Sequence, residues 1–178
     1  MKSNISTILS LGFLGCLLTV TASAQKASPH ETTTATIAGK KITIVYGRPY
    51  VKGRDVWHTA VAPAGKVWRT GADEATKFTT DADLMVGTVH VPAGTYSLFT
   101  IPSGDTGNWM LILNKTADQW GAFKYEEKQD LGRTAMKVKK LSAPVEQLTI
   151  TVEPGKGSNG TLKIAWADSE ASVPVMVH

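Results

Sequence analysis

Short runs of alternating apolar and polar residues, separated by glycine and proline, constrain the fold of this chain most. In residues 41–47, the side chains of Ile42, Ile44 and Tyr46 fall on one face of an extended chain. Residues 109–113 are continuously apolar, as in a strand covered on both faces. The same period of two recurs in residues 84–91, 95–101, 134–139, 147–153, 161–167 and 172–177. The pattern predicts many short strands with one buried face.

Helical signals are few. Asp55 and Thr116 are suited to cap short helical turns over residues 55–62 and 116–122. Many strands and few helices predict an all-β fold, an antiparallel β-sandwich or jelly roll with one or two short helices and nearer nine strands than seven. A closed barrel is the alternative, because periodicity does not distinguish one closed sheet from two stacked ones. Residues 92–94, Pro-Ala-Gly, predict a hairpin between the flanking strands.

The first residues have the features of an export signal. Lys2 precedes an apolar run over residues 8–20, and Ala22-Ser23-Ala24 offers a small-residue cleavage site. The run, about 13 residues long, is shorter than the roughly 20 needed to span a bilayer, so no transmembrane segment is expected. We therefore predict a signal peptide over residues 1–24, removed after Ala24.

The same signal predicts the compartment and the mature chain. Residues 25–178 are expected to form a single β-sandwich domain in the periplasm or outside the cell. Cys16 allows a lipoprotein alternative, but this cysteine lies inside the apolar run rather than at its end, which favours cleavage after Ala24.

Composition excludes several classes of function. Cys16 is the single cysteine of the chain, so removal of the signal would leave no disulfide, thiol nucleophile or thiolate metal ligand. The net charge of +4, or +3 without Lys2, is mildly basic, and the chain has no long basic block that would indicate nucleic-acid binding. The four histidines are isolated in the sequence, so we expect no metal site and no cofactor.

Residues 46–76 combine arginines, aromatic residues and an adjacent acidic pair. Guanidinium groups bind carboxylates or phosphates through paired hydrogen bonds, and aromatic rings offer flat apolar walls. We therefore predict a binding site for a small anionic or sugar-like ligand in this segment. Its expected residues are Arg48, Arg54, Trp57, Trp68, Arg69, Asp73 and Glu74.

Two other interpretations remain open for the segment. A hydrolase acting on a carbohydrate or another cell-envelope substrate would use Glu74 as acid or base, with a second carboxylate that the sequence does not identify. A structural or partner-binding envelope module would instead use Arg69 to pair with Asp73 or Glu74, and Arg48 to secure a strand end. The oligomeric state is not indicated.

Five separated motifs resemble a known bacterial family. They are YGRPYVKGR, KVWRTGADEAT, VPAGTYSLFTIP, LILNK with QWGAF, and LKIAWADSEASVPV, in that order from about Ser28 to Val175. They are similar to the domain of unknown function 2911. The resemblance implies an exported bacterial protein whose biochemical role is not established. Gly47 stands where that family usually has serine, and Asp73 where it has asparagine, so the resemblance implies no hydroxyl nucleophile at position 47.

Overall fold

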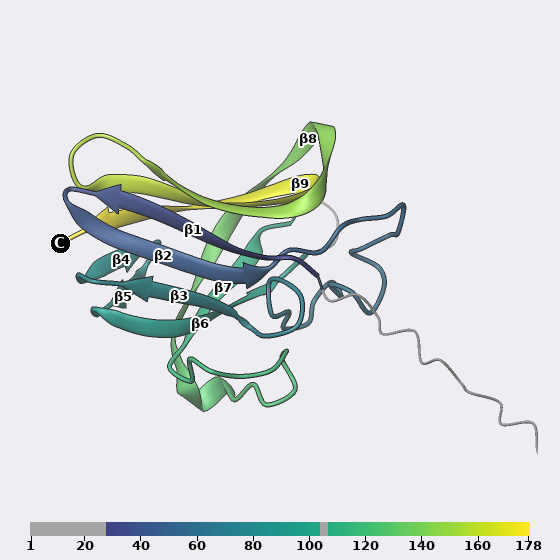
Figure 1. Cartoon of the computed structure of the whole chain (residues 1–178), viewed down its shortest axis with the longest axis horizontal. Coiled ribbons are helices and arrows are strands. Elements are labelled where there is room, and N and C mark those ends of the chain that lie inside the picture. The colour runs from purple at the N-terminus through teal and green to yellow at the C-terminus, as the bar shows by residue number, and fades with distance from the viewer. Residues whose placement is uncertain (1–27, 104–106) are drawn as a thin grey trace, which may run out of the picture.

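The computed structural model describes residues 28–103 and 107–178, and the predicted signal peptide lies outside these residues. Nine strands and one short helix make up the described fold (Figure 1). In chain order they are β1 (His30–Ile37), β2 (Lys40–Gly47), β3 (Thr76–Thr80), β4 (Leu84–Val86), β5 (Val89–Val91), β6 (Gly94–Ile101), β7 (Trp109–Asn114), the 3₁₀ helix η1 (Glu127–Gln129), β8 (Asp130–Pro154) and β9 (Asn159–Val177).

The strands form one antiparallel sheet in the order β1-β2-β3-β6-β7-β8-β9-β4-β5. Every pair in this order is antiparallel, which confirms the predicted all-β class. Within residues 28–103 and 107–178, no ladder joins the two ends of the order, β1 and β5. The sheet is therefore open and folds over itself as a sandwich, rather than closing as a barrel.

The long strands β8 and β9 carry the chain from one layer of the sandwich to the other. The start of β8 pairs with β7, and its remainder pairs with β9. Its register shifts between Lys140 and Val145 and again between Val145 and Thr149. Such irregularities bend a strand and increase its twist. The β8–β9 hairpin consequently lies across β1 and β2 (Figure 1).

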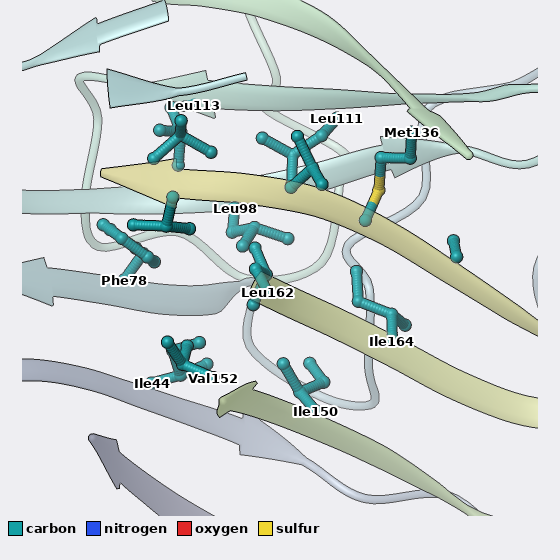
Figure 2. Packing of buried hydrophobic residues seen from close by; sticks show 14 of the residues in the cluster. Ile44, Phe78, Leu98, Leu111, Leu113, Met136, Ile150, Val152, Leu162 and Ile164 are labelled. Carbon is teal, nitrogen blue, oxygen red and sulfur yellow. The ribbon is translucent and has the colours of Figure 1, made fainter. Parts of the chain in front are cut away.

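The core lies between the two layers. Figure 2 shows apolar side chains from β2, β3, β6 and β7 meeting those from β8 and β9. Its fully buried members include Ile44, Phe78, Leu98, Leu111, Leu113, Met136, Ile150, Leu162 and Ile164. The alternating residues found in the sequence therefore supply the buried apolar area that stabilises the fold.

The two predicted helical turns are absent from the structure. Asp55 does act as a cap, because its Oδ1 accepts hydrogen bonds from the backbone N–H groups of Trp57 (3.2 Å) and His58 (3.1 Å). The chain then forms a wide loop in which the N–H of Ala62 donates to the carbonyl of Val56, 3.1 Å away. The Trp57 side chain is buried in the core, and this wide loop takes the place of a helix.

The second predicted turn, residues 116–122, also forms no helix. The backbone of Gln119 and Gly121 instead pairs with that of Ala75 and Asp73, through hydrogen bonds of 3.0 Å each. A segment bonded to a neighbouring chain in this way cannot direct the same groups into helical bonds. The only helical element in the described residues is η1.

The predicted hairpin across residues 92–94 is wrong as well. β5 pairs only with β4, whereas β6 lies between β3 and β7. The turn therefore connects an edge strand to a different part of the sheet. Prolines and glycines indicate where a strand ends, but not which strand it will pair with.

Candidate functional site

The connection between β2 and β3, residues 48–75, lies at one end of the sandwich and carries the predicted site (Figure 1). Its candidate residues do not converge on one place. Two tryptophans enter the core, and the arginines and acidic residues separate among different surroundings, described in turn below.

Trp57 and Trp68 belong to a cluster of four tryptophans. The ring of Trp57 lies edge-on to Trp109 with centroids 4.9 Å apart, and Trp68 stacks on Trp166 at 5.6 Å. Trp68 is only 2% exposed. Trp57 is 6% exposed, and its Nε1–H donates a 3.2 Å hydrogen bond to Asp168 Oδ1. Trp57 thus combines core packing with a polar contact at the edge of the core.

Arg48 holds neighbouring strands together. Its Nε donates to the carbonyl of Leu148 at 2.7 Å, and its guanidinium also donates to Glu31 Oε2 (2.7 Å) and Thr149 Oγ1 (2.9 Å). These bonds join the end of β2 to β1 and β8. The arrangement matches the structural interpretation of this residue.

Arg54 closes its own turn. Its Nε donates to the carbonyl of Val51 at 2.9 Å, and its Nη2 donates to that of Tyr50. The side chain is exposed.

Arg69 and Asp73 form a partly buried polar site. Arg69 Nε and Asp73 Oδ2 are buried and have no hydrogen-bond partner in the described part of the chain. Burial lowers the pKa of Arg69, and the charge of Asp73 opposes that shift. Asp73 also has a positive φ of 64°, which few residues other than glycine adopt.

Glu74 lies apart from the arginines, on the surface. Its Oε2 is 2.9 Å from Nε2 of His30, the first residue of β1. This hydrogen bond is the main reason why the pKa of Glu74 is lowered. A lowered pKa keeps the carboxylate ionised, which suits a base or a hydrogen-bond acceptor and does not suit a general acid.

A cavity of about 640 Å³ opens beside Arg54 and Trp57; we call it the end cavity. Its wall combines the loop over residues 51–58 with the bend of β8 and the middle of β9. Apolar lining comes from Val51, Val56, Trp57, Val138, Pro144 and Ala167, and polar lining from Arg54, Asp55, His58, Lys140, Glu146, Asp168 and Ser169.

The polar groups of the end cavity are held by defined contacts. Asp168 Oδ1 accepts from Trp57 and from Ser169 Oγ (3.0 Å), while Lys140 Nζ is 3.9 Å from Asp168 Oδ2. Glu146 Oε1 accepts the backbone N–H of Lys52 at 2.8 Å. The resulting lining offers fixed acceptors beside an apolar wall, an arrangement able to orient a small polar ligand.

Sequence reasoning missed Lys140, Glu146 and Asp168 as partners of the arginine- and tryptophan-rich loop. They lie far along the chain, in β8 and β9, and reach the loop only through the bend of β8 and its pairing with β9. The one weak signal in the sequence for this approach is that the alternation of apolar and polar residues stops after Lys140, where β8 bends.

Other classes of site receive no support within residues 28–103 and 107–178. No group of three or more histidine, cysteine, aspartate or glutamate side chains in this part of the chain could hold a metal ion. No helix in it is long and apolar enough to cross a membrane.

Fold and site together define an antiparallel β-sandwich with a ligand-sized cavity at one end. Residues 28–175 match the family described as a protein of unknown function, DUF2911, and the chain belongs to that family. Comparison with curated proteins and with solved structures found no match. The family assignment confirms the resemblance seen in the motifs, and it brings no ligand or reaction with it.

Proposed function

We propose that this protein binds a small, uncharged, sugar-like molecule in the end cavity. The observation that carries the proposal is the cavity itself: about 640 Å³, with an apolar wall that includes Trp57 and several fixed polar groups. Ligand pockets commonly fall between about 300 and 1,000 Å³ and combine apolar walls with a few orienting polar groups.

The charges around the cavity favour a sugar over an anion. Asp55, Glu146 and Asp168 contribute three carboxylates, against the two cationic side chains of Arg54 and Lys140. Arg54 also has its Nε and Nη2 engaged by backbone carbonyls. A phosphate or carboxylate would therefore meet excess negative charge, whereas hydroxyl groups can donate to the carboxylates.

Binding is better supported than hydrolysis. Cleavage of a glycosidic bond requires a carboxylic acid whose pKa is raised. Asp55 is one of the three carboxylates that line the end cavity, and its pKa is instead lowered, first by a hydrogen bond from the His58 backbone. Glu74, the acid or base expected from the sequence, also has a lowered pKa and does not line the end cavity.

Thermal unfolding and calorimetry of residues 25–178 test the proposal. The ligands are neutral monosaccharides and disaccharides, with phosphorylated and carboxylated sugars for comparison. A ligand at about 100 times its Kd should stabilise the protein by roughly 2.7 kcal/mol. We expect a neutral sugar to do so.

The matched variants are Asp168→Asn and Glu153→Gln. Asparagine keeps an oxygen for Trp57 Nε1 but removes the charge, and should weaken binding roughly tenfold or more. Glu153 pairs with Lys163 outside the cavity, so Glu153→Gln removes the same charge without touching the cavity and serves as the control. Binding confined to anionic sugars, or equal effects of the two variants, would contradict the proposal.

The compartment forms part of the same proposal. Residues 1–24 support export to the periplasm or beyond the cell, with cleavage after Ala24. N-terminal sequencing of the protein recovered from a producing bacterium should begin at Gln25. A lipid-modified Cys16 would show that the lipoprotein alternative holds.

A further inference from the structure

A groove separate from the end cavity runs across the start of β3. Two hollows of about 260 and 270 Å³ share Glu74, Ala75 and Lys77 as a common floor. One hollow continues towards His30 and the end of β2, and the other towards residues 117–120. We call the two together the Glu74 groove. None of its lining residues lines the end cavity.

The backbone fixes the floor and one wall of this groove. Glu74 pairs with Trp120 in an antiparallel bridge, and the N–H of Ala75 donates to the carbonyl of Gln119 at 3.0 Å. Residues 119–121 are therefore held beside residues 73–75, and Trp120 has a defined position at the rim.

Trp120 differs from every other tryptophan of the protein. The other four of the five are buried and pack against one another, whereas Trp120 is 59% exposed. A ring this exposed does not contribute to the packing of the core. At the rim of a polar groove, the ring offers a flat surface on which an apolar face of a ligand can stack.

The polar groups of the groove are a hydrogen-bonded pair and an ion pair. Glu74 is paired with His30, and Lys77 with Asp118. Each pair presents an acceptor beside a donor, and each carboxylate already has a hydrogen-bond partner. A ligand with a strong net charge would gain little from them, whereas adjacent hydroxyl groups can donate and accept at the same time.

We propose that the Glu74 groove binds a neutral saccharide chain, with one sugar ring stacked on Trp120. Each hollow alone is smaller than the usual pocket for an isolated ligand, but the shared floor makes them two neighbouring subsites. A chain of linked rings fills two such subsites at once. This inference does not depend on the function proposed for the end cavity.

Affinity gel electrophoresis of residues 25–178 in soluble dextran, mannan and xylan tests binding, with alginate as the polyanionic comparison. Acrylamide quenching of tryptophan fluorescence reports the site, because Trp120 is the exposed tryptophan of the five. We expect at least one neutral polysaccharide to retard the protein and its oligosaccharide to protect the accessible fluorescence from quenching.

Trp120→Ala should weaken retardation roughly tenfold or more, as the loss of an aromatic anchor does at other binding surfaces. Phe123→Ala is the matched control, since Phe123 is 85% exposed in the same loop but does not line the groove. Asp118→Asn should also weaken binding, because it removes one half of an ion pair in the groove.

Three results would overturn the inference: no retardation by any neutral polysaccharide, stronger retardation by alginate, or equal losses in Trp120→Ala and Phe123→Ala. The sugar-binding function proposed for the end cavity is tested independently of the Glu74 groove. Asp168→Asn should leave binding of the polysaccharide in the Glu74 groove unchanged. Trp120→Ala should leave binding of a small sugar in the end cavity unchanged.

Discussion

The guanidinium of Arg48 joins β2 to two other strands, and its loss should weaken the whole protein. In Arg48→Ala, the carbonyl of Leu148 loses a charged donor and Glu31 loses its cation. Hydrogen bonds to charged groups contribute about 1.5–3 kcal/mol each, so we expect the free energy of unfolding to fall by about 2–3 kcal/mol. Urea unfolding measures this change.

Arg54→Ala is the control for Arg48→Ala, because Arg54 is exposed and its hydrogen bonds in the described ranges lie within its own turn. Its cost should remain below about 1 kcal/mol. If both variants lose the same stability, Arg48 does not hold the strands in the way described.

The His30–Glu74 pair should make stability depend on acidity. Its hydrogen bond lowers the pKa of Glu74 in the folded state below the ordinary value of 4.5. As the pH falls, Glu74 is therefore protonated in the unfolded chain before it is protonated in the folded protein. The contribution of the pair to the free energy of unfolding is complete above about pH 4.5 and is lost as the pH falls through the folded pKa. The side chain is 57% exposed, so the effect is small.

Glu74→Gln removes this titration. We expect urea midpoints measured between about pH 3 and pH 6 to fall less steeply for this variant than for the parent protein. Asp55→Asn serves as a comparison, since Asp55 also has a lowered pKa but pairs with His58, in a different part of the β2–β3 connection. An unchanged slope in Glu74→Gln would show that the pair does not form in solution.

For single residues, the sequence indicated which ones are unusual but not where their side chains lie in the fold. Arg48, Trp68 and Glu74 lie within one short segment, yet they face β8, the core and the surface respectively. Side-chain direction in an irregular loop depends on long-range contacts, which spacing along the chain does not contain. Lys140 and Asp168 were missed for the same reason.

Among the elements, the loop over residues 115–126 is secured by a three-residue network. Tyr125 Oη donates to Asp130 Oδ2, and Arg133 donates to both of them, each bond being 2.7 Å long. The Tyr125 ring also lies edge-on to Phe99 of β6, with centroids 5.1 Å apart. The network fastens the loop to the start of β8.

This network should make the stability of the protein depend on pH in alkaline solution. Burial, followed by the Asp130 contact, raises the pKa of Tyr125 to about 12. The unfolded chain loses this proton near pH 10, so the contribution to stability is complete below about pH 10 and is lost as the pH rises towards about 12. Spectrophotometric titration of the folded protein should show a late phenolate component that Tyr125→Phe lacks. A Tyr125→Phe curve with the late component intact would assign it to another tyrosine.

The strands were predictable where apolar residues alternate or form one continuous run. β2, β6 and β7 match runs found in the sequence to within a residue at each end. β3 was missed because its buried face is formed by Thr76, Phe78 and Thr80, so threonine conceals the alternation. β8 was predicted as two strands because its bend falls in residues 141–146, where the alternation stops.

Across the whole molecule, β8 and β9 belong to both layers of the sandwich. β8 pairs with β7 at its start and with β9 beyond, and the end of β9 pairs with β4. Neither layer can lose its strands without removing a partner from the other. Both layers also share one hydrophobic core. The described part of the protein should therefore unfold as a single cooperative unit.

Paired substitutions on opposite sides of the core test that cooperativity. Leu111 in β7 and Leu162 in β9 are both fully buried, and replacing either by alanine should cost about 2–5 kcal/mol. Circular dichroism reports the strands, while fluorescence is dominated by the tryptophan cluster at one end. Because the core is shared, both probes should shift together in both variants. If Leu162→Ala moved the circular dichroism transition alone, the layers would be separate folding units, and the bent strands would join them without coupling them.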